Sequence, residues 1–130
     1  MKNRKFPLLV NEFSQMIKQG TLTLEAEQGL VCHCLGRDIV IEDGQRIGLT
    51  KQVVIVAPLG IKVTAKVQVE INATFTLSKD GYLAEMKSLG CCLIRHLALP
   101  EHPRTLLEEV NQSLVIVNQI LQEIESNVAA

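Results

Sequence analysis

The sequence is poor in aromatic residues, with three Phe, one Tyr and no Trp among 130 residues. Nucleic-acid bases are commonly held by stacking on aromatic side chains, so the chain offers few such platforms. It also lacks an excess of positive charge. The chain has 13 Lys and Arg residues and 14 Asp and Glu residues, which gives a net charge of −1. Without a basic field to attract a phosphate backbone, nucleic acid is not an expected partner.

The sequence also lacks an apolar run of the ~20 residues that a transmembrane helix requires. The short run Phe6–Val10 is followed at once by Asn11 and Glu12, so it is too short for the apolar region of a secretory signal. We therefore expect no transmembrane segment and a cytoplasmic location.

Enough apolar residues are present to build a core. Hydrophobic residues make up 47% of the chain and the mean hydropathy is +0.20, which excludes a disordered protein. Because aromatic residues are rare, the core must consist of Val, Ile and Leu, and the β-branched members of this set favour a sheet. A chain of 130 residues suits a single domain over 1–130.

Both ends of the chain have the period of an amphipathic helix. Apolar residues at steps of three and four predict a first helix over 6–19, with a stripe of Phe6, Leu9, Val10, Phe13, Met16 and Ile17. Pro7 suits the start of this helix and Gly20 its end. The same spacing predicts a long closing helix over 104–126, with a stripe of Leu107, Val110, Leu114, Val117, Leu121 and Ile124.

Between the two helices, β-branched and alternating segments bounded by turn residues are typical of β-strands. We expect strands within 21–99, in the segments 21–27, 30–35, 38–41, 46–57, 61–77, 82–88 and 91–99. The clearest alternation is that of Ile61–Leu77, where every odd-numbered residue is apolar and every even-numbered residue is polar. A strand places these two sets on opposite faces, whereas a helix mixes them. Such a strand would be about 55 Å long at ~3.3 Å per residue, so we expect it to curve or to carry a bulge.

Because one face of this strand is wholly polar, we expect helices to cover only the other face of the sheet. The predicted fold class is therefore α+β. It has an N-terminal helix, a long curved antiparallel sheet of about six to seven strands packed on one face by the helices, and a long C-terminal helix.

Two helices can leave part of an apolar sheet face uncovered, and three interpretations of that surface are open. It can form a groove for a lipid or another hydrophobic ligand between the long strand and the C-terminal helix. It can pair with a second copy in a homo-oligomeric scaffold, because the stripe on the C-terminal helix suits helix–helix pairing. It can also simply complete the core. The residues expected at this surface are Val63, Val67, Ile71, Phe75, Leu114, Val117 and Leu121.

The order of the segments carries a resemblance. In sequence they are Asn11 and Met16-Ile17 on the first helix, Leu22–Glu27, the long strand, Leu77–Leu83, Leu97–Pro100, and Glu109–Asn111 with Asn118 on the last helix. In this pattern the chain resembles the tubular lipid-binding (TULIP-like) proteins. The resemblance implies a long wrapped sheet and a helix that together enclose an acyl-chain groove.

Two cysteine clusters, Cys32-His33-Cys34 and Cys91-Cys92, are the candidate metal ligands. A zinc site could draw thiolates from both clusters if their strands are neighbours. Neither cluster has the spacing of a zinc knuckle and both have apolar neighbours, so we favour structural core thiols over a metal site or a disulfide.

No motif for catalysis is present. Cys92 and His96 would lie about 13 Å apart along one strand, too far for proton transfer. The sequence has no phosphate loop, nucleophile elbow or His-Glu metal helix. We therefore expect a non-enzymatic module with no catalytic residues, metal or cofactor.

Overall fold

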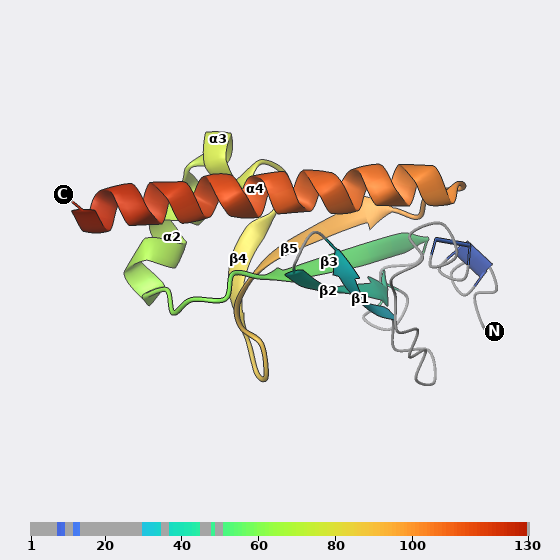
Figure 1. The fold of residues 1–130 in the computed structure, drawn as a ribbon, viewed down its shortest axis with the longest axis horizontal. Helices are drawn as coiled ribbons and strands as arrows, with labels where there is room; N and C mark the ends of the chain where they lie inside the picture. The colour runs from blue at the N-terminus through green and yellow to red at the C-terminus, as the bar shows by residue number, and fades with distance from the viewer. Residues whose placement is uncertain are drawn as a thin grey trace.

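The computed structural model describes residues 8, 9, 12, 13, 30–34, 37–44, 48 and 51–129. The helices and strands follow one another as β1 (Leu30–Cys34), β2 (Arg37–Asp43), β3 (Gln52–Pro58), α2 (Ala65–Ala73), α3 (Phe75–Ser78), β4 (Tyr82–Met86), β5 (Gly90–Ala98) and α4 (Pro103–Ala129). The long helix α4 lies along one face of the sheet (Figure 1).

The strands form one antiparallel sheet in the order β1-β2-β3-β5-β4. The helices α2 and α3 therefore lie in the connection from β3 to the edge strand β4, which passes β5. In β3, at the centre, all residues from Val53 to Ala57 are buried, which is why this segment is almost continuously apolar.

The predicted architecture is wrong in the number of strands and in the longest of them. Five strands are present in the described part of the chain, against the six to seven expected. The segment 61–77, predicted as one long curved strand, contains the two helices α2 and α3. The predicted strand at 21–27 and most of the first helix at 6–19 lie outside the described residues, although residues 8, 9, 12 and 13 are helical.

Local contacts explain why Ala65–Ala73 is helical. The hydroxyl of Thr64 accepts a hydrogen bond from the Val67 backbone N–H at 3.3 Å, so Thr64 caps the N-terminus of α2. Residues four apart lie on the same face of a strand, and they also lie on the same face of a helix, so this spacing fits both structures. Val63, Val67 and Ile71 have this spacing and pack against the core, so the alternation contained a helical face as well.

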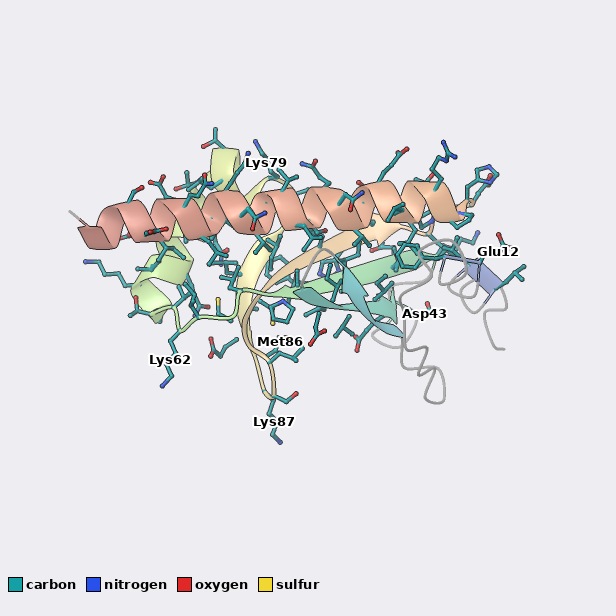
Figure 2. All side chains as sticks on the ribbon, viewed as in Figure 1. Glu12, Asp43, Lys62, Lys79, Met86 and Lys87 are labelled. Carbon is teal, nitrogen blue, oxygen red and sulfur yellow. The ribbon has the colours of Figure 1, made fainter. Side chains whose placement is uncertain are left out.

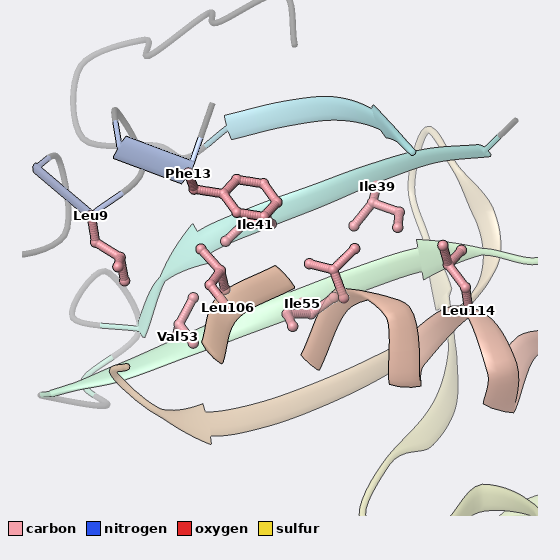
Figure 3. Close-up of a cluster of buried hydrophobic side chains, with 9 residues drawn as sticks. Leu9, Phe13, Ile39, Ile41, Val53, Ile55, Leu106 and Leu114 are labelled. Atoms are coloured by element: carbon pink, nitrogen blue, oxygen red, sulfur yellow. The ribbon is translucent and has the colours of Figure 1, made fainter. Parts of the chain in front are cut away.

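Two apolar clusters fill the space between α4 and the sheet. The first joins α4 to β2 and β3, and Figure 3 shows its labelled side chains between the helix and these strands. Its buried members are Leu9, Phe13, Ile39, Ile41, Val53, Ile55, Leu106, Val110 and Leu114. The second lies farther along α4 and joins it to α2, β4 and β5; its buried members are Ala57, Leu59, Ile71, Leu83, Cys91, Leu93, Ile116, Val117 and Ile120. The C-terminal helix expected at 104–126 is thus confirmed and packs through its predicted stripe.

The other face of the central strands is also apolar. Val54, Val56, Cys92 and Ile94 are buried there, at most 7% exposed, and Met86 packs beside them on the side away from α4 (Figure 2). The expectation that this sheet buries only the helix-covered face is therefore incorrect for β3 and β5. The polar face from which it was derived belongs to α2 and α3, not to the sheet.

Candidate functional site

The seven residues expected at a ligand-binding or interface surface do not lie together. Five of them pack in the second cluster: Val63, Val67, Ile71, Val117 and Leu121. Leu114 belongs to the first cluster. Ile71 is 4% exposed and Val117 is fully buried, whereas the Phe75 side chain is 76% exposed. Phe75 is therefore the one member of the set that is free to meet another molecule.

Helix α2 docks on the edge strand β4 through polar side chains. The Asn72 amide donates to the Leu83 carbonyl oxygen at 3.1 Å and accepts from the Leu83 N–H at 2.6 Å, so it pairs with the strand edge as a neighbouring strand would. Gln68 donates to the Val63 carbonyl oxygen and to the Glu85 carboxylate. Both side chains belong to the polar set of the alternation and both face the sheet. These contacts protect the edge of β4 from other strands.

The outward face of α2 carries both apolar and charged side chains. Four residues of α2 are exposed on its outer side. Val69 and Ala73 lie opposite to Val67 and Ile71, and Lys66 and Glu70 lie beside them on one flank. Val69 is 67% exposed. Neither Lys66 nor Glu70 forms an ion pair within the part of the chain that the structure describes.

Phe75, the first residue of α3, follows the end of α2 by two residues and is exposed. Thr74 separates the two helices, and the Leu77 N–H bonds to its carbonyl oxygen at 2.9 Å. Lys79, with a φ of 56°, ends α3 by donating its N–H to the Phe75 carbonyl oxygen. We call the exposed residues Ile61, Lys66, Val69, Glu70, Ala73 and Phe75 the α2–α3 surface.

A buried arginine fastens the end of α3 to the rest of the fold. Arg95 on β5 is 3% exposed, and its guanidinium donates to both carboxylate oxygens of Asp80, at 2.8 and 3.1 Å. It also donates to the Glu109 carbonyl oxygen and to the Ser113 hydroxyl of α4, both at 2.9 Å. With these partners the guanidinium is committed to protein contacts and offers no free site for an anion.

The charges in this network stabilise each other. The hydrogen bond from Arg95 lowers the pKa of Asp80, against a smaller rise caused by burial. Burial alone would lower the pKa of Arg95, but the bond to Asp80 and the charges of Asp80 and Glu109 raise it overall. The network therefore positions the turn that carries Asp80, directly after α3.

The cysteines do not form a metal site in the described part of the chain. β1, which carries Cys32 and Cys34, is separated from β5 by β2 and β3, a distance of about 14 Å at ~4.8 Å per strand. Zinc–sulfur bonds are ~2.3 Å long, so the two clusters cannot share one ion. No group of three His, Cys, Asp or Glu residues suited to a metal occurs among the described residues.

The thiols of Cys91 and Cys92 are free, and burial raises the pKa of each to about 11. At neutral pH they are protonated and poorly nucleophilic. His96 stacks on Tyr82, with ring centroids 5.5 Å apart and 2.7 Å between the hydroxyl and Nε2. The His96 side chain is therefore held by the Tyr82 side chain.

A separate cavity of about 540 Å³ lies where the residues after β5 meet the N-terminal helical residues. It is lined by Leu8, Leu9, Glu12, Lys51, Ala98, Leu99, Pro100 and Glu101. Lys51 has a φ of 58°, a conformation that non-glycine residues rarely adopt, and its carbonyl oxygen accepts from the Leu99 N–H at 2.9 Å. The volume is in the range of small-molecule pockets.

The sequence pattern placed Lys66 and Glu70 on the polar face of a strand and Val69 on its apolar face, so it did not predict that these three residues share one surface. Thr64, a strong N-cap residue ahead of a four-residue spacing, was the available signal. Arg95 was also missed, although a single charge within an apolar strand indicates a buried partner. Its partner Asp80 lies 15 residues away, and no local pattern connects the two.

Comparison with known proteins shows the fold alone. No protein-family model matches the sequence, and no curated protein matches it. A crystal structure of YbjN from E. coli, described as a proposed transcription regulator, is similar with a TM-score of 0.53. The similarity covers 91% of this chain and 90% of that one, at 10% sequence identity. None of the described helices combines the length and the apolar character that a membrane span needs.

Proposed function

We propose that this chain is a non-enzymatic interaction module that associates with a second copy of itself through the α2–α3 surface. The observation that carries this proposal is Phe75, whose side chain is 76% exposed, whereas the Phe13 side chain is fully buried in the core. Aromatic side chains dominate the energetics of protein interfaces. A second copy is favoured as the partner because the same surface presents one basic and one acidic side chain about one helical turn apart beside Val69, an arrangement that is complementary to itself in an antiparallel pair.

We propose a non-enzymatic role from the state of two kinds of buried side chain in the described part of the chain. The buried Arg95 is fully engaged with protein groups, and Cys91 and Cys92 are protonated at neutral pH. Protonated, buried thiols also suit a reducing compartment, so we propose a cytoplasmic location. The regulator role described for YbjN is not transferred, because an identity of 10% supports the fold only.

Light scattering of the wild-type chain tests the proposal. We expect a concentration-dependent rise above the 14.4 kDa of one chain, and a return to that mass in Phe75→Ser. The matched control is Leu89→Ser, which removes another exposed apolar side chain at the β4–β5 turn, far from α2 and α3 (Figure 1). A wild-type mass that stays at 14.4 kDa at every concentration would refute self-association.

A second candidate function is the binding of a small hydrophobic ligand, and the cavity lined by Leu9 and Leu99 favours it. The proposed lipid groove between the sheet and α4 is filled by the second cluster, so this cavity is where such a ligand would fit. Extraction of the purified protein with organic solvent, followed by mass spectrometry, should then release an acyl-chain compound. Leu99→Glu should abolish the signal, and an empty extract from the wild type would eliminate this candidate.

A further inference from the structure

We infer that the two copies pair α2 against α2 in antiparallel orientation, with Lys66 of each copy facing Glu70 of the other. This inference rests on the proposed self-association and specifies its register. The pairing is isologous: a twofold axis relates the copies, so each contact occurs twice.

The register follows from the geometry of α2. Lys66 and Glu70 are four residues apart, about 6 Å along the axis at ~1.5 Å per residue, and they lie on the same outward face. A twofold axis level with residue 68 places Lys66 opposite Glu70 in both directions. Each pair then brings opposite charges together, and the two Val69 side chains lie within about 3 Å of the same height.

The side chains at this face are free to make these contacts. Lys66 and Glu70 are exposed, and the structure gives neither of them an ion-pair partner among the described residues. Ala73, one turn beyond Val69, is small enough to let two helices approach closely. The opposite face of α2 is held on β4 by Gln68 and Asn72, so α2 presents its outer face as a fixed surface.

The same axis places the remaining apolar residues at the two ends of the contact. Phe75 follows α2 and Ile61 precedes it, each seven residues from the level of the axis. In an antiparallel pair we expect Phe75 of one copy to lie at the end of the contact where the chain of the other copy enters α2, after Ile61, which is 44% exposed. The interface then has an apolar contact at each end, and between them two ion pairs beside a pair of Val69 side chains. Both copies contribute the same residues to this arrangement.

Charge reversal tests the register. Lys66→Glu gives four acidic side chains at the axis and Glu70→Lys gives four basic ones, so each variant alone should raise the dimer dissociation constant at least about 10-fold at low salt. An equimolar mixture of Lys66→Glu with Glu70→Lys should form a heterodimer, because every facing pair then has opposite charges. The double variant Lys66→Glu with Glu70→Lys should dimerise with itself within about threefold of the wild type.

The matched control is Lys87→Glu, which makes the same change of charge at the tip of the β4–β5 turn, away from α2 (Figure 2). Sedimentation velocity of each protein, and of the mixture with one variant fluorescently labelled, measures the association. If the wild type is a dimer sensitive to Phe75→Ser but the reversals behave like Lys87→Glu, the register is overturned while the proposed function stands. If both reversals weaken the dimer but the mixture forms no heterodimer, Lys66 and Glu70 do not face each other and the inference is also overturned. A wild type that is monomeric throughout removes the proposed function itself.

Discussion

Replacing Phe75 with serine should separate association from folding. Because the side chain is 76% exposed, its removal takes little from the core of one chain. Exposed substitutions of this kind change the free energy of unfolding by about 0.5 kcal/mol or less. The effect on the dimer should be far larger.

The size of that effect follows from the exposed area. A phenylalanine residue offers about 150–250 Å² of surface, of which roughly three quarters is exposed here. If the second copy covers about half of that exposed area, each Phe75 contributes about 2 kcal/mol at ~25 cal/mol per Å². Two copies per dimer give about 4 kcal/mol, which corresponds to a dissociation constant raised roughly 1,000-fold at ~1.4 kcal/mol per decade.

Sedimentation velocity over a dilution series measures this change, and urea denaturation of the same samples measures the stability of the fold. Leu89→Ser, also an exposed apolar residue, should leave both quantities unchanged. A Phe75→Ser variant that dimerises within about threefold of the wild type would refute the reasoning. A variant that unfolds in less urea, even at concentrations where the wild type is monomeric, would show that Phe75 serves the fold instead.

Three further predictions concern the elements that hold α2 and α3 in place, each measured by urea denaturation at one fixed protein concentration. Asn72→Ala removes both bonds to Leu83 and should cost about 1–2 kcal/mol of unfolding free energy, whereas an unchanged midpoint would show that α2 is held by its apolar contacts alone. Gly81→Ala should cost about 1–3 kcal/mol, because a Cβ at this position would lie 2.9 Å from the Ile94 carbonyl oxygen; a neutral result would mean that the turn can shift away from β5. Asp80→Asn should cost about 1–2 kcal/mol at pH 7, since half of the Asp80 side chain is solvated. Because folding lowers the pKa of Asp80, the Asp80 carboxylate stabilises the fold above its unfolded pKa of about 4, and this stabilisation is lost as the pH falls through the folded pKa. The unfolding free energies of the variant and the wild type should therefore converge in acid. A difference that stays constant across pH would show that the ion pair does not cause it.

The sequence was informative where one period alone fits a segment. The stripe of α4 has the spacing of a helix and no other, and β5 is an apolar run closed by Pro100, so both elements could be predicted. The segment 61–77 satisfied two periods at once. Its alternation suits a strand, but Val63, Val67 and Ile71 also share a helical face, and a 17-residue strand would exceed the usual 3–10 residues.

Tertiary contacts determine that this segment forms helices and not a strand. Gln68 and Asn72 bond to Glu85 and Leu83 on a strand that follows in the sequence, and no pattern within 61–77 reveals these partners. Because the segment is helical, the residues that are open to a partner also differ from those expected. Phe75 was expected on an inward face as part of the alternating set, whereas the break at Thr74 turns it outward.

The location of the contact is tested most directly by following the backbone amide resonances of the ¹⁵N-labelled wild-type chain over a dilution series. We expect the concentration-dependent shifts to concentrate on residues 61–76, with the β4–β5 turn unchanged. Spectra that do not change with concentration, or shifts that map to the outer face of α4 around Val115 instead, would contradict self-association through the α2–α3 surface.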